Sequence, residues 1–513
     1  MTNVAIDIEQ RRAEREQRAK RSIAAVAADP EAAEGTQLAA VIRLILRAGR
    51  VLLDDNGTAF FHPPGAVAVP LASSKFRDIV AGLSQMAGMT IKASVCKDAV
   101  FNLRGAALAA NAPCAVRVRV AGGPEAMYLH LGSDEVVTIT KTGWDVASWK
   151  GLKAPPALFV EPNGYLGLVR PERGGSVHEL RNLLNVSDSA FALVVMWLVA
   201  AMRPAKVYPI LAFVGPKGSA KSTSTRIIRD LVDCNVTAHR AIPRKEGDLA
   251  IAAQHGHVQS FDNLSGIGND LSDALCRMAT GGGFGKRTLY SDGDETTFQI
   301  SKPIILNGID ELGERADLGS RTYLARLEIP RVRKTEAEIA SIFATAAPRV
   351  LGALLDALVV ALRDVESVPT PDCRMADAAQ WALACEGSLG FPEGTFATAL
   401  EENAMALEEV ALEASPVAEA VEQFAAGLAS PWEGTSTELD GLLRMGRPGE
   451  MHMSPDGWPR GVRAFGLALR RILGDLRIAR VEEISIGRGS ERRRGLRVRR
   501  RDAEESPLGS SGP

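Results

Sequence analysis

The sequence predicts a multidomain protein with an α/β core. The chain has 513 residues, which at about 150 residues per domain corresponds to roughly three domains. Apolar residues make up 46% of the chain and charged residues 24%, as in ordinary globular proteins. Between Tyr208 and Arg331, apolar strand-like runs alternate with helical stretches, which is the pattern of a parallel sheet covered by helices. The composition changes on both sides of this core, so we expect further domains there.

These changes in composition divide the chain into six expected segments. A stretch of mixed charge at the N-terminus predicts a solvated helix or a disordered arm, with a binding arm as the alternative. Short alternating runs broken by Gly, Pro and Asp-Asn-Gly turns predict a small α+β domain with a helix over about residues 75–89. The segments are 1–36 (arm), 37–165 (small α+β domain of unknown role), 166–335 (α/β core), 336–430 (helical domain), 431–501 (basic domain) and 502–513 (disordered tail).

Charge, hydropathy and cysteine content exclude several classes of protein. The 60 basic residues balance 62 acidic ones, so any preference for an anionic partner must be local. The apolar run Ala190–Met202 is shorter than the roughly 18 residues that cross a bilayer and is typical of a buried helix. The six cysteines form no CxxC pair, which favours reduced thiols over disulfides or zinc. Without a secretory signal after the basic N-terminal residues, we expect a cytoplasmic protein with no membrane partner.

A glycine-rich segment follows the first strand of the core. The strand-like run Tyr208–Val214 leads into Gly215-Pro216-Lys217-Gly218-Ser219-Ala220-Lys221-Ser222-Thr223, and an amphipathic helix follows. This order is that of a P-loop, whose backbone N–H groups and helix N-terminus surround phosphate oxygens. Lys221 is expected to reach the β and γ phosphates of ATP, and Ser222 to ligate Mg²⁺. Ala220 replaces the last glycine of the pattern, and its methyl group would be tolerated if φ is negative there. The alternative is a tight turn that merely joins strand to helix.

The next strand end supplies an acidic residue. The run Val258–Phe261 ends at Asp262, which we expect to hold Mg²⁺ through water or Ser222. A second carboxylate often follows at this place, but here the residue is Asn263. Because an amide cannot accept a proton, we expect hydrolysis to be slow or to use another base, such as Asp270 or Asp273.

Further along the core, a hairpin precedes another strand. The runs flanking the Asp292-Gly293-Asp294 turn alternate as in a β-hairpin, and Lys286 and Arg287 on its first strand are expected to contact DNA phosphates. The strand Lys302–Leu306 then delivers Asn307, whose amide is expected to position the hydrolytic water. Beyond it lie Arg315, Arg321 and Arg326; an arginine offered to a neighbouring γ phosphate would stabilise the transition state, and a surface ion pair is the alternative.

The order of these motifs resembles a known family. The segments GPKGSAKST, FDN, ATGGGFGKRTLY, ILNG and SRTYLARLEIP are similar to those of the superfamily 3 helicase type of AAA+ ATPase, found in phage and plasmid primase-helicases. The resemblance covers roughly residues 205–331. The chain as a whole looks like the ATP-binding proteins of bacterial prophages and integrated elements.

This resemblance implies roles for individual residues. Lys221 and Ser222 would be Walker A residues, Asp262 the Walker B residue, Asn307 sensor 1 and Arg321 the arginine finger. It also implies a homo-oligomeric ring, usually a hexamer, that draws a DNA strand through a pore lined by hairpins. The acidic hairpin tip departs from the family, whose members usually place a basic residue there.

The C-terminal part is strongly basic. Between Arg460 and Arg501 there are 14 arginines and four acidic residues, a local excess of ten positive charges. A capped short helix, an amphipathic helix over 460–476 and two alternating strands (479–486 and 495–499) predict a winged helix that binds duplex DNA. A solvated basic surface or a protein-docking winged helix is the alternative. The arginines expected to contact DNA are Arg463, Arg470, Arg471, Arg488, Arg492, Arg493 and Arg494.

The predicted fold class is therefore a multidomain α/β protein with a P-loop AAA+ core, an N-terminal α+β domain, a helical segment and a C-terminal winged helix. The first functional hypothesis is an Mg²⁺-dependent ATPase, a DNA-associated motor or helicase for replication or maintenance of a phage or mobile element. The second is a DNA-binding protein that hydrolyses ATP slowly or not at all and uses it as an assembly ligand. A metabolic kinase is disfavoured, because the sequence shows no acceptor site and the basic C-terminus would be unexplained.

Overall fold

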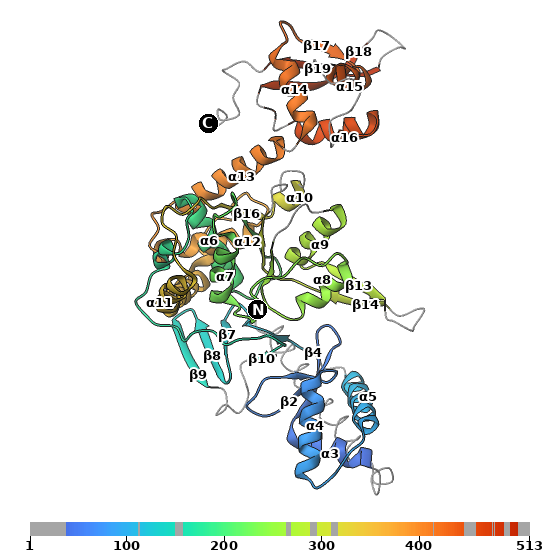
Figure 1. Ribbon diagram of the computed structural model, residues 1–513, viewed down its shortest axis with the longest axis vertical. Coiled ribbons are helices and arrows are strands. Elements are labelled where there is room, and N and C mark those ends of the chain that lie inside the picture. Colours follow the sequence, from blue (N-terminus) through green and yellow to red (C-terminus); the bar gives the residue numbers. More distant parts are fainter. Residues whose placement is uncertain are drawn as a thin grey trace. The chain divides into compact units, whose positions relative to one another are not determined.

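The structure is a computed structural model in which helices and sheets alternate along the chain (Figure 1), so the predicted multidomain α/β character is confirmed. Its residues fall into two compact units, which are described separately: residues up to 264, 273–308 and 321–399, and residues 265–272, 309–320 and 400–513. The structure describes residues 37–110, 113–148, 157–262, 268–287, 295–308, 316–413, 415–445, 458–473, 476, 478–486 and 493–500.

The first unit begins with a small α+β layer. Its sheet has the order β3-β2-β1-β4, and the Asp54 carboxylate accepts from the backbone N–H groups of Asn56 (2.9 Å) and Thr58 (2.7 Å), which forms the predicted turn between β1 and β2. The helix expected over 75–89 is α4, capped by Ser73. The elements are α3 (Gln37–Ala48), β1 (Arg50–Asp54), β2 (Ala59–His62), β3 (Val69–Pro70), α4 (Ser74–Met86), α5 (Ala93–Ala110) and β4 (Pro113–Cys114).

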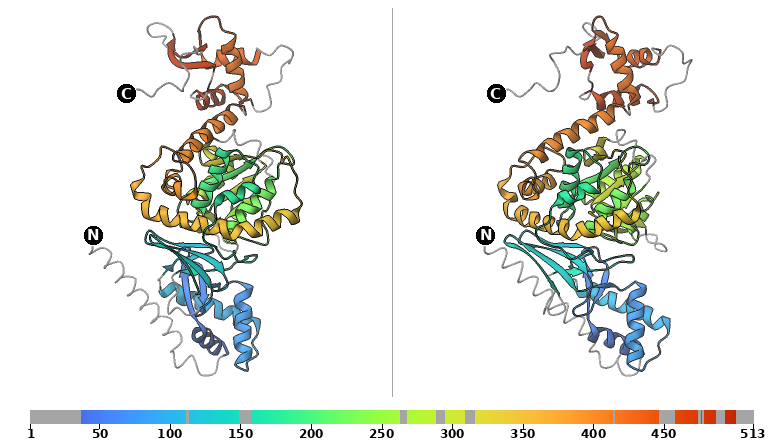
Figure 2. Two further views of the ribbon diagram at one scale, coloured as in Figure 1. Left: turned by 90° about the vertical axis from the view of Figure 1, so that its left-hand side faces the viewer. Right: turned by 60° about the vertical axis from the view of Figure 1, so that its left-hand side comes forward.

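A second, antiparallel sheet follows with the order β6-β7-β8-β9. The alternating run 115–120 is split into β5 and β6, and β5 pairs in parallel with β10. The long helix α11 runs along β8 and β9 of this sheet (Figure 2), where the Trp144 indole N–H donates to Asp356 (2.7 Å). The strands are β5 (Val116–Arg117), β6 (Val120–Gly122), β7 (Ala126–Gly132), β8 (Glu135–Thr140), β9 (Gly143–Ser148) and β10 (Leu158–Phe159).

The core of the first unit is a parallel sheet with the order β12-β15-β11-β16. The predicted buried helix is α6, whose residues from Ala190 to Ala201 are all buried. The hairpin expected beyond α9 is β13–β14, an antiparallel pair. The elements are η2 (Val177–Asn182), α6 (Asp188–Ala201), β11 (Ile210–Val214), α7 (Lys221–Val232), α8 (Glu246–Ala253), β12 (Gln259–Phe261), α9 (Asn269–Thr280), β13 (Gly283–Arg287), β14 (Glu295–Gln299), β15 (Ile304–Asn307) and β16 (Thr322–Arg326).

Helices complete the first unit. α11 starts with a capping box between Thr335 and Glu338. At Gly352 an added Cβ would lie 1.8 Å from the carbonyl oxygen of Glu172, so the helix approaches this segment too closely for any side chain. Among the described residues, one helical stretch, Glu336–Ser367, is long and apolar enough to cross a membrane, but most of its apolar length is buried inside the protein. The elements are α11 (Glu336–Asp364), η4 (Val365–Ser367), α12 (Ala376–Cys385), η5 (Gly387–Leu389) and the first residues of α13 (Thr395–Glu413), of which residues 400–413 belong to the second unit.

Among its described residues, the second unit contains four α-helices that lie wholly within it and a three-stranded antiparallel sheet of order β17-β19-β18. The two expected strands are β18 and β19. α14 precedes the expected start of this region at residue 431, yet its Val417 and Val421 belong to the same core as Phe465 and Val498. The elements are α10 (Ala316–Gly319), α14 (Pro416–Ala426), β17 (Trp432–Gly434), α15 (Ser436–Met445), α16 (Val462–Ile472), β18 (Ala479–Ile486) and β19 (Arg493–Arg500).

Candidate functional site

A loop with a left-handed backbone joins β11 to α7. Gly215 and Gly218 have φ angles of +148° and +88°, a region that glycine tolerates best. A Cβ at Gly215 would lie 2.4 Å from the carbonyl oxygen of Leu327, which leaves no room for a side chain. The strand, loop and helix predicted from the sequence are therefore present in the predicted order.

The condition under which the Ala220 methyl group would be tolerated, a negative φ, is not met. Its φ is +64° and its ψ is 30°, in the left-handed helical region. There the Cβ of an L-residue crowds the following carbonyl oxygen, at a cost of about 1–2 kcal/mol. Residue 220 thus adopts a conformation suited to glycine. It is also the N-cap of α7 and makes no side-chain cap hydrogen bond, so it leaves the first-turn N–H groups of the helix to other acceptors.

The loop and the start of α7 present several hydrogen-bond donors. The Lys221 ammonium donates to the carbonyl oxygens of Gly215 (2.6 Å) and Pro216 (3.1 Å). The Ser219 hydroxyl is buried and has no hydrogen-bond partner among the described residues. The first turn of α7 contains no acidic residue. An ammonium, an unsatisfied hydroxyl and free helix N–H groups are the donors that bind an oxyanion.

Three parallel strands bring the other predicted residues to this loop. Asp262 follows β12, and its carboxylate accepts from the Ser222 hydroxyl at 3.1 Å and 3.4 Å. Asn307 ends β15, is buried, and donates through its side-chain amide to the Thr225 hydroxyl of α7 (3.3 Å). Because the carboxyl ends of parallel strands share one edge of the sheet, Lys221, Ser222, Asp262 and Asn307 meet there.

Two basic residues beside the loop were missed from the sequence. The His239 imidazole Nε2 lies 3.1 Å from an Asp262 carboxylate oxygen, because Arg240 bridges in parallel to Phe261 and adds a short segment beside β12. The Arg333 guanidinium lies 3.8 Å from the position of a Cβ at Gly218. A lone histidine and an arginine in a basic linker match no spacing rule, so the sequence held no signal for either.

The structure places Arg321 away from the loop. In the register of β11 and β16, Ile210 pairs with Thr322 and Val214 with Arg326. Arg321 therefore lies at the amino edge of the sheet, opposite the loop, and its side chain is 7% exposed. Arg326 lies at the loop edge and is exposed.

Several predicted residues lie outside the part that the structure describes. These are Asn263, Arg315, Asp292 and Asp294, the arm 1–36 and the tail 502–513, together with Arg488 and Arg492 and the side chains of Lys286, Arg287, Arg471 and Arg493.

The remaining expected DNA contacts are on α16 and β19. Arg463 is exposed on α16. Arg470 and Arg494 both bind one carboxylate, that of Glu483 on β18, at 3.0 Å and 2.5 Å. The hydrogen bond from Arg494 is the main reason that the pKa of Glu483 is lowered. Two of the expected DNA contacts are therefore already paired with a carboxylate.

Comparisons with known proteins identify the class. The family model described as actinomycete integrative conjugative element replication protein matches residues 177–398, and the model of the AICE RepA C-terminal domain matches residues 417–508. Together they cover more than half of the chain, so this is a replication protein of a mobile genetic element, as the sequence predicted. Specifically, the chain belongs to the family of actinomycete integrative conjugative element replication proteins, AICE RepA. No curated protein matches it.

Solved structures give weaker likenesses. An A-form apo structure of the NrS-1 C-terminal region has a TM-score of 0.35 and 11% identity, and covers 60% of this chain and 66% of that one. Another apo structure of that region has a TM-score of 0.38 and 12% identity, and covers 89% of this chain and 96% of that one. JCV helicase with a bound acetamide compound has a TM-score of 0.20 and 15% identity, and covers 43% of this chain and 66% of that one. Scores of this size establish neither a shared fold nor a shared activity.

Proposed function

We propose that residues 215–223 form a P-loop that binds ATP with Mg²⁺. We also propose that the chain hydrolyses ATP as a DNA-associated, helicase-like motor with a superfamily 3-like AAA+ core, in replication of its element. One observation carries this proposal: Lys221, Ser222, Asp262 and Asn307 come from three separate segments and meet at one edge of a parallel sheet. They lie beside a loop whose Gly215 leaves no room for a side chain next to Leu327.

The binding role follows from the donor set. Lys221, released from its own loop carbonyls, reaches the β and γ phosphates, and the α7 N–H groups face the same anion. Ser222 and Asp262 fit Mg²⁺, because this ion takes one or two protein oxygens and completes its shell with phosphates and water. When bound, the metal supplies charge neutralisation at the phosphates.

For hydrolysis, Asn307 orients the attacking water. Asn263 does not replace a carboxylate base, so we expect slow turnover. Arg321 lies at the edge of the sheet opposite its own loop and is 7% exposed, so the arginine-finger role requires both the nucleotide of another copy and a rearrangement that exposes the guanidinium. The proposal therefore includes a homo-oligomer, with a hexameric ring as its expected form.

The test compares Lys221→Ala with Lys141→Ala, an exposed lysine on the β8–β9 turn, in the full-length protein. MgATP affinity and ATP turnover are measured with and without DNA. We expect Lys221→Ala to abolish both and Lys141→Ala to match wild type. Equal binding by Lys221→Ala and wild type contradicts the proposal. Binding without turnover in wild type supports the second hypothesis, in which ATP is an assembly ligand.

We further propose that residues 416–500 form a winged helix that binds duplex DNA. The support is the order of α14, α15 and α16 around a sheet that ends in the arginine-rich hairpin β18–β19. Arg463 on α16 is expected to contact a phosphate, so Arg463→Ala should weaken duplex binding and lower its salt slope by about one. Arg77→Ala, exposed on α4, is the control. Equal losses for both variants contradict this role.

A further inference from the structure

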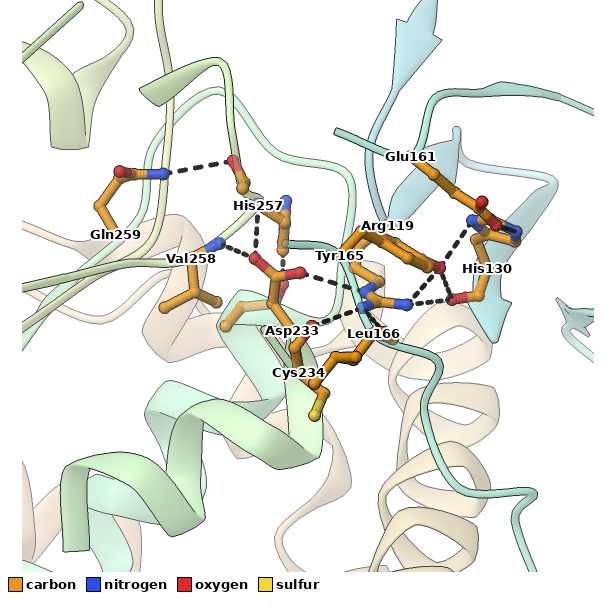
Figure 3. A network of polar contacts seen from close by, with 12 residues as sticks. Arg119, His130, Glu161, Tyr165, Leu166, Asp233, Cys234, His257, Val258 and Gln259 are labelled. Atoms are coloured by element: carbon orange, nitrogen blue, oxygen red, sulfur yellow. Dashed lines mark hydrogen bonds and ion pairs between the residues drawn. The ribbon is translucent and has the colours of Figure 1, made fainter. Parts of the chain in front are cut away.

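One buried carboxylate joins the far ends of two elements of the proposed nucleotide site. Asp233 is the C-cap of α7 and is 1% exposed. One of its oxygens accepts from the backbone N–H groups of His257 (2.7 Å) and Val258 (2.9 Å), which directly precede β12 (Figure 3). The end of α7 and the start of β12 are therefore held at a fixed separation.

The other oxygen of Asp233 accepts from Arg119 Nε (3.1 Å). The Arg119 side chain is fully buried, and each of its five N–H donors has an acceptor. The remaining acceptors are the carbonyl oxygens of His130 (3.1 Å), Cys234 (3.0 Å) and Leu166, and the Tyr165 hydroxyl. Figure 3 shows the guanidinium between the Asp233 carboxylate and the Tyr165–His130 pair. Its orientation is thus fully determined.

The Asp233 contact lies where it can affect the geometry of the proposed nucleotide site. α7 begins at Lys221 and Ser222 and ends at Asp233, whereas β12 begins beside Asp233 and ends at Asp262. A helix and a buried strand are stiff, so a displacement at Asp233 moves the residues at their other ends.

Arg119 comes from a different part of the chain. It lies between β5 and β6, 114 residues before Asp233 and ahead of both family-matched segments. Its own carbonyl oxygen accepts from the His130 N–H of β7 (2.8 Å), which anchors it to the antiparallel sheet. Arg119 therefore links the sheet β6–β9 to the C-terminal end of α7.

We propose that Arg119 is a positioning residue for the nucleotide site, because through Asp233 it sets the relative placement of α7 and β12. The N-terminal sheet β6–β9, which anchors Arg119, then contributes to nucleotide binding. This inference rests on the proposed function. Stability alone does not require such a pair, because packed apolar side chains often replace a buried ion pair without loss. The five acceptors around the Arg119 guanidinium instead fix its orientation relative to Asp233.

The test uses Arg119→Lys, which keeps the charge but loses donors, and Tyr165→Phe, which removes a single acceptor. Arg117→Lys is the matched control, since Arg117 lies two residues away, is 44% exposed and pairs with the exposed Asp55. In full-length protein, at a temperature where every variant is folded, MgATP affinity and hydrogen exchange of the amides of residues 218–222 are measured. We expect about tenfold weaker binding for Arg119→Lys, about threefold for Tyr165→Phe, and faster loop exchange in both.

The outcomes separate the two claims. If Arg119→Lys and Tyr165→Phe lower the melting temperature but leave affinity and loop exchange as in Arg117→Lys, the pair is structural only and the inference is overturned. If wild type does not bind MgATP, or Lys221→Ala binds it equally, the proposed function fails instead. Loop exchange needs no nucleotide, so it tests the positioning role even then.

Discussion

Asp233 in the first unit and Glu483 in the second both bind arginine, but in opposite surroundings. Asp233 and its partner Arg119 are 1% and 0% exposed, whereas Glu483 is 35% exposed and its partners Arg470 and Arg494 are 51% and 70% exposed. Asp233 also accepts two backbone N–H groups, whereas Glu483 is shared between two side chains.

This difference teaches what each carboxylate does. A buried charge that loses its partner cannot be solvated, so the pair must be kept intact and can hold a geometry. An exposed pair is solvated and screened, so it adds little stability. The exposed carboxylate instead partly neutralises the charge of the two arginines that it binds.

Breaking the buried pair should have the largest effect. We expect Asp233→Ala to lower the free energy of unfolding by about 3–5 kcal/mol, because the Arg119 guanidinium stays buried without its counter-ion. Urea unfolding followed by circular dichroism measures this. The double variant Arg119→Met with Asp233→Leu should regain at least half of the loss. If the double variant is no more stable than Asp233→Ala, the unpaired charge is not the cause.

Acid should act on the buried network first. Burial, and then the charge of Arg119, lower the pKa of His130 from 6.5 to about 3. A histidine with a lowered folded pKa contributes stability above its unfolded pKa, and this stability is lost as the pH falls below 6.5. At pH 5 the loss from His130 is about 2 kcal/mol. The Glu483 contribution persists there, because its pKa lies below 4.5.

His130→Gln tests this assignment, since the amide keeps an acceptor for the Tyr165 hydroxyl, which lies 2.8 Å from His130 Nδ1. Between pH 7 and pH 5, the free energy of unfolding of the variant should fall by about 2 kcal/mol less than that of wild type. Parallel pH profiles for the two proteins would refute the buried histidine as the acid-sensitive group.

The sequence predicted the parts of the site that depend on local order. A strand, a glycine-rich loop and a helix are contiguous, and Asp262 and Asn307 end buried strands, which meet at one edge of a parallel sheet. Arg119 was not predictable. Arg117 and Arg119 both occupy the polar positions of one alternating run, yet Arg117 is exposed and Arg119 is fully buried. The difference is made by Asp233, 114 residues away, and no spacing rule connects them.

The left-handed backbone at Ala220 should have a smaller effect on stability than the buried ion pair. Ala220→Gly should raise the free energy of unfolding by about 1 kcal/mol, because glycine adopts the observed φ of +64° without crowding. MgATP affinity should not fall. Thermal unfolding measures the first expectation and nucleotide titration the second. A destabilised variant would mean that residue 220 does not have a left-handed backbone.

The smallest change in stability is expected for Glu483→Gln. The exposed pairs add little, so the melting temperature should stay at the wild-type value. Duplex DNA binding should strengthen severalfold at low salt, because Arg470 and Arg494 lose their counter-ion and become available to phosphates. The slope of log affinity against log salt should steepen by about one. Glu433→Gln, which frees only Arg497 on the same sheet, is the matched control. If Glu483→Gln melts earlier and binds DNA no better, Glu483 is a structural carboxylate like Asp233, and the contrast between the two units fails.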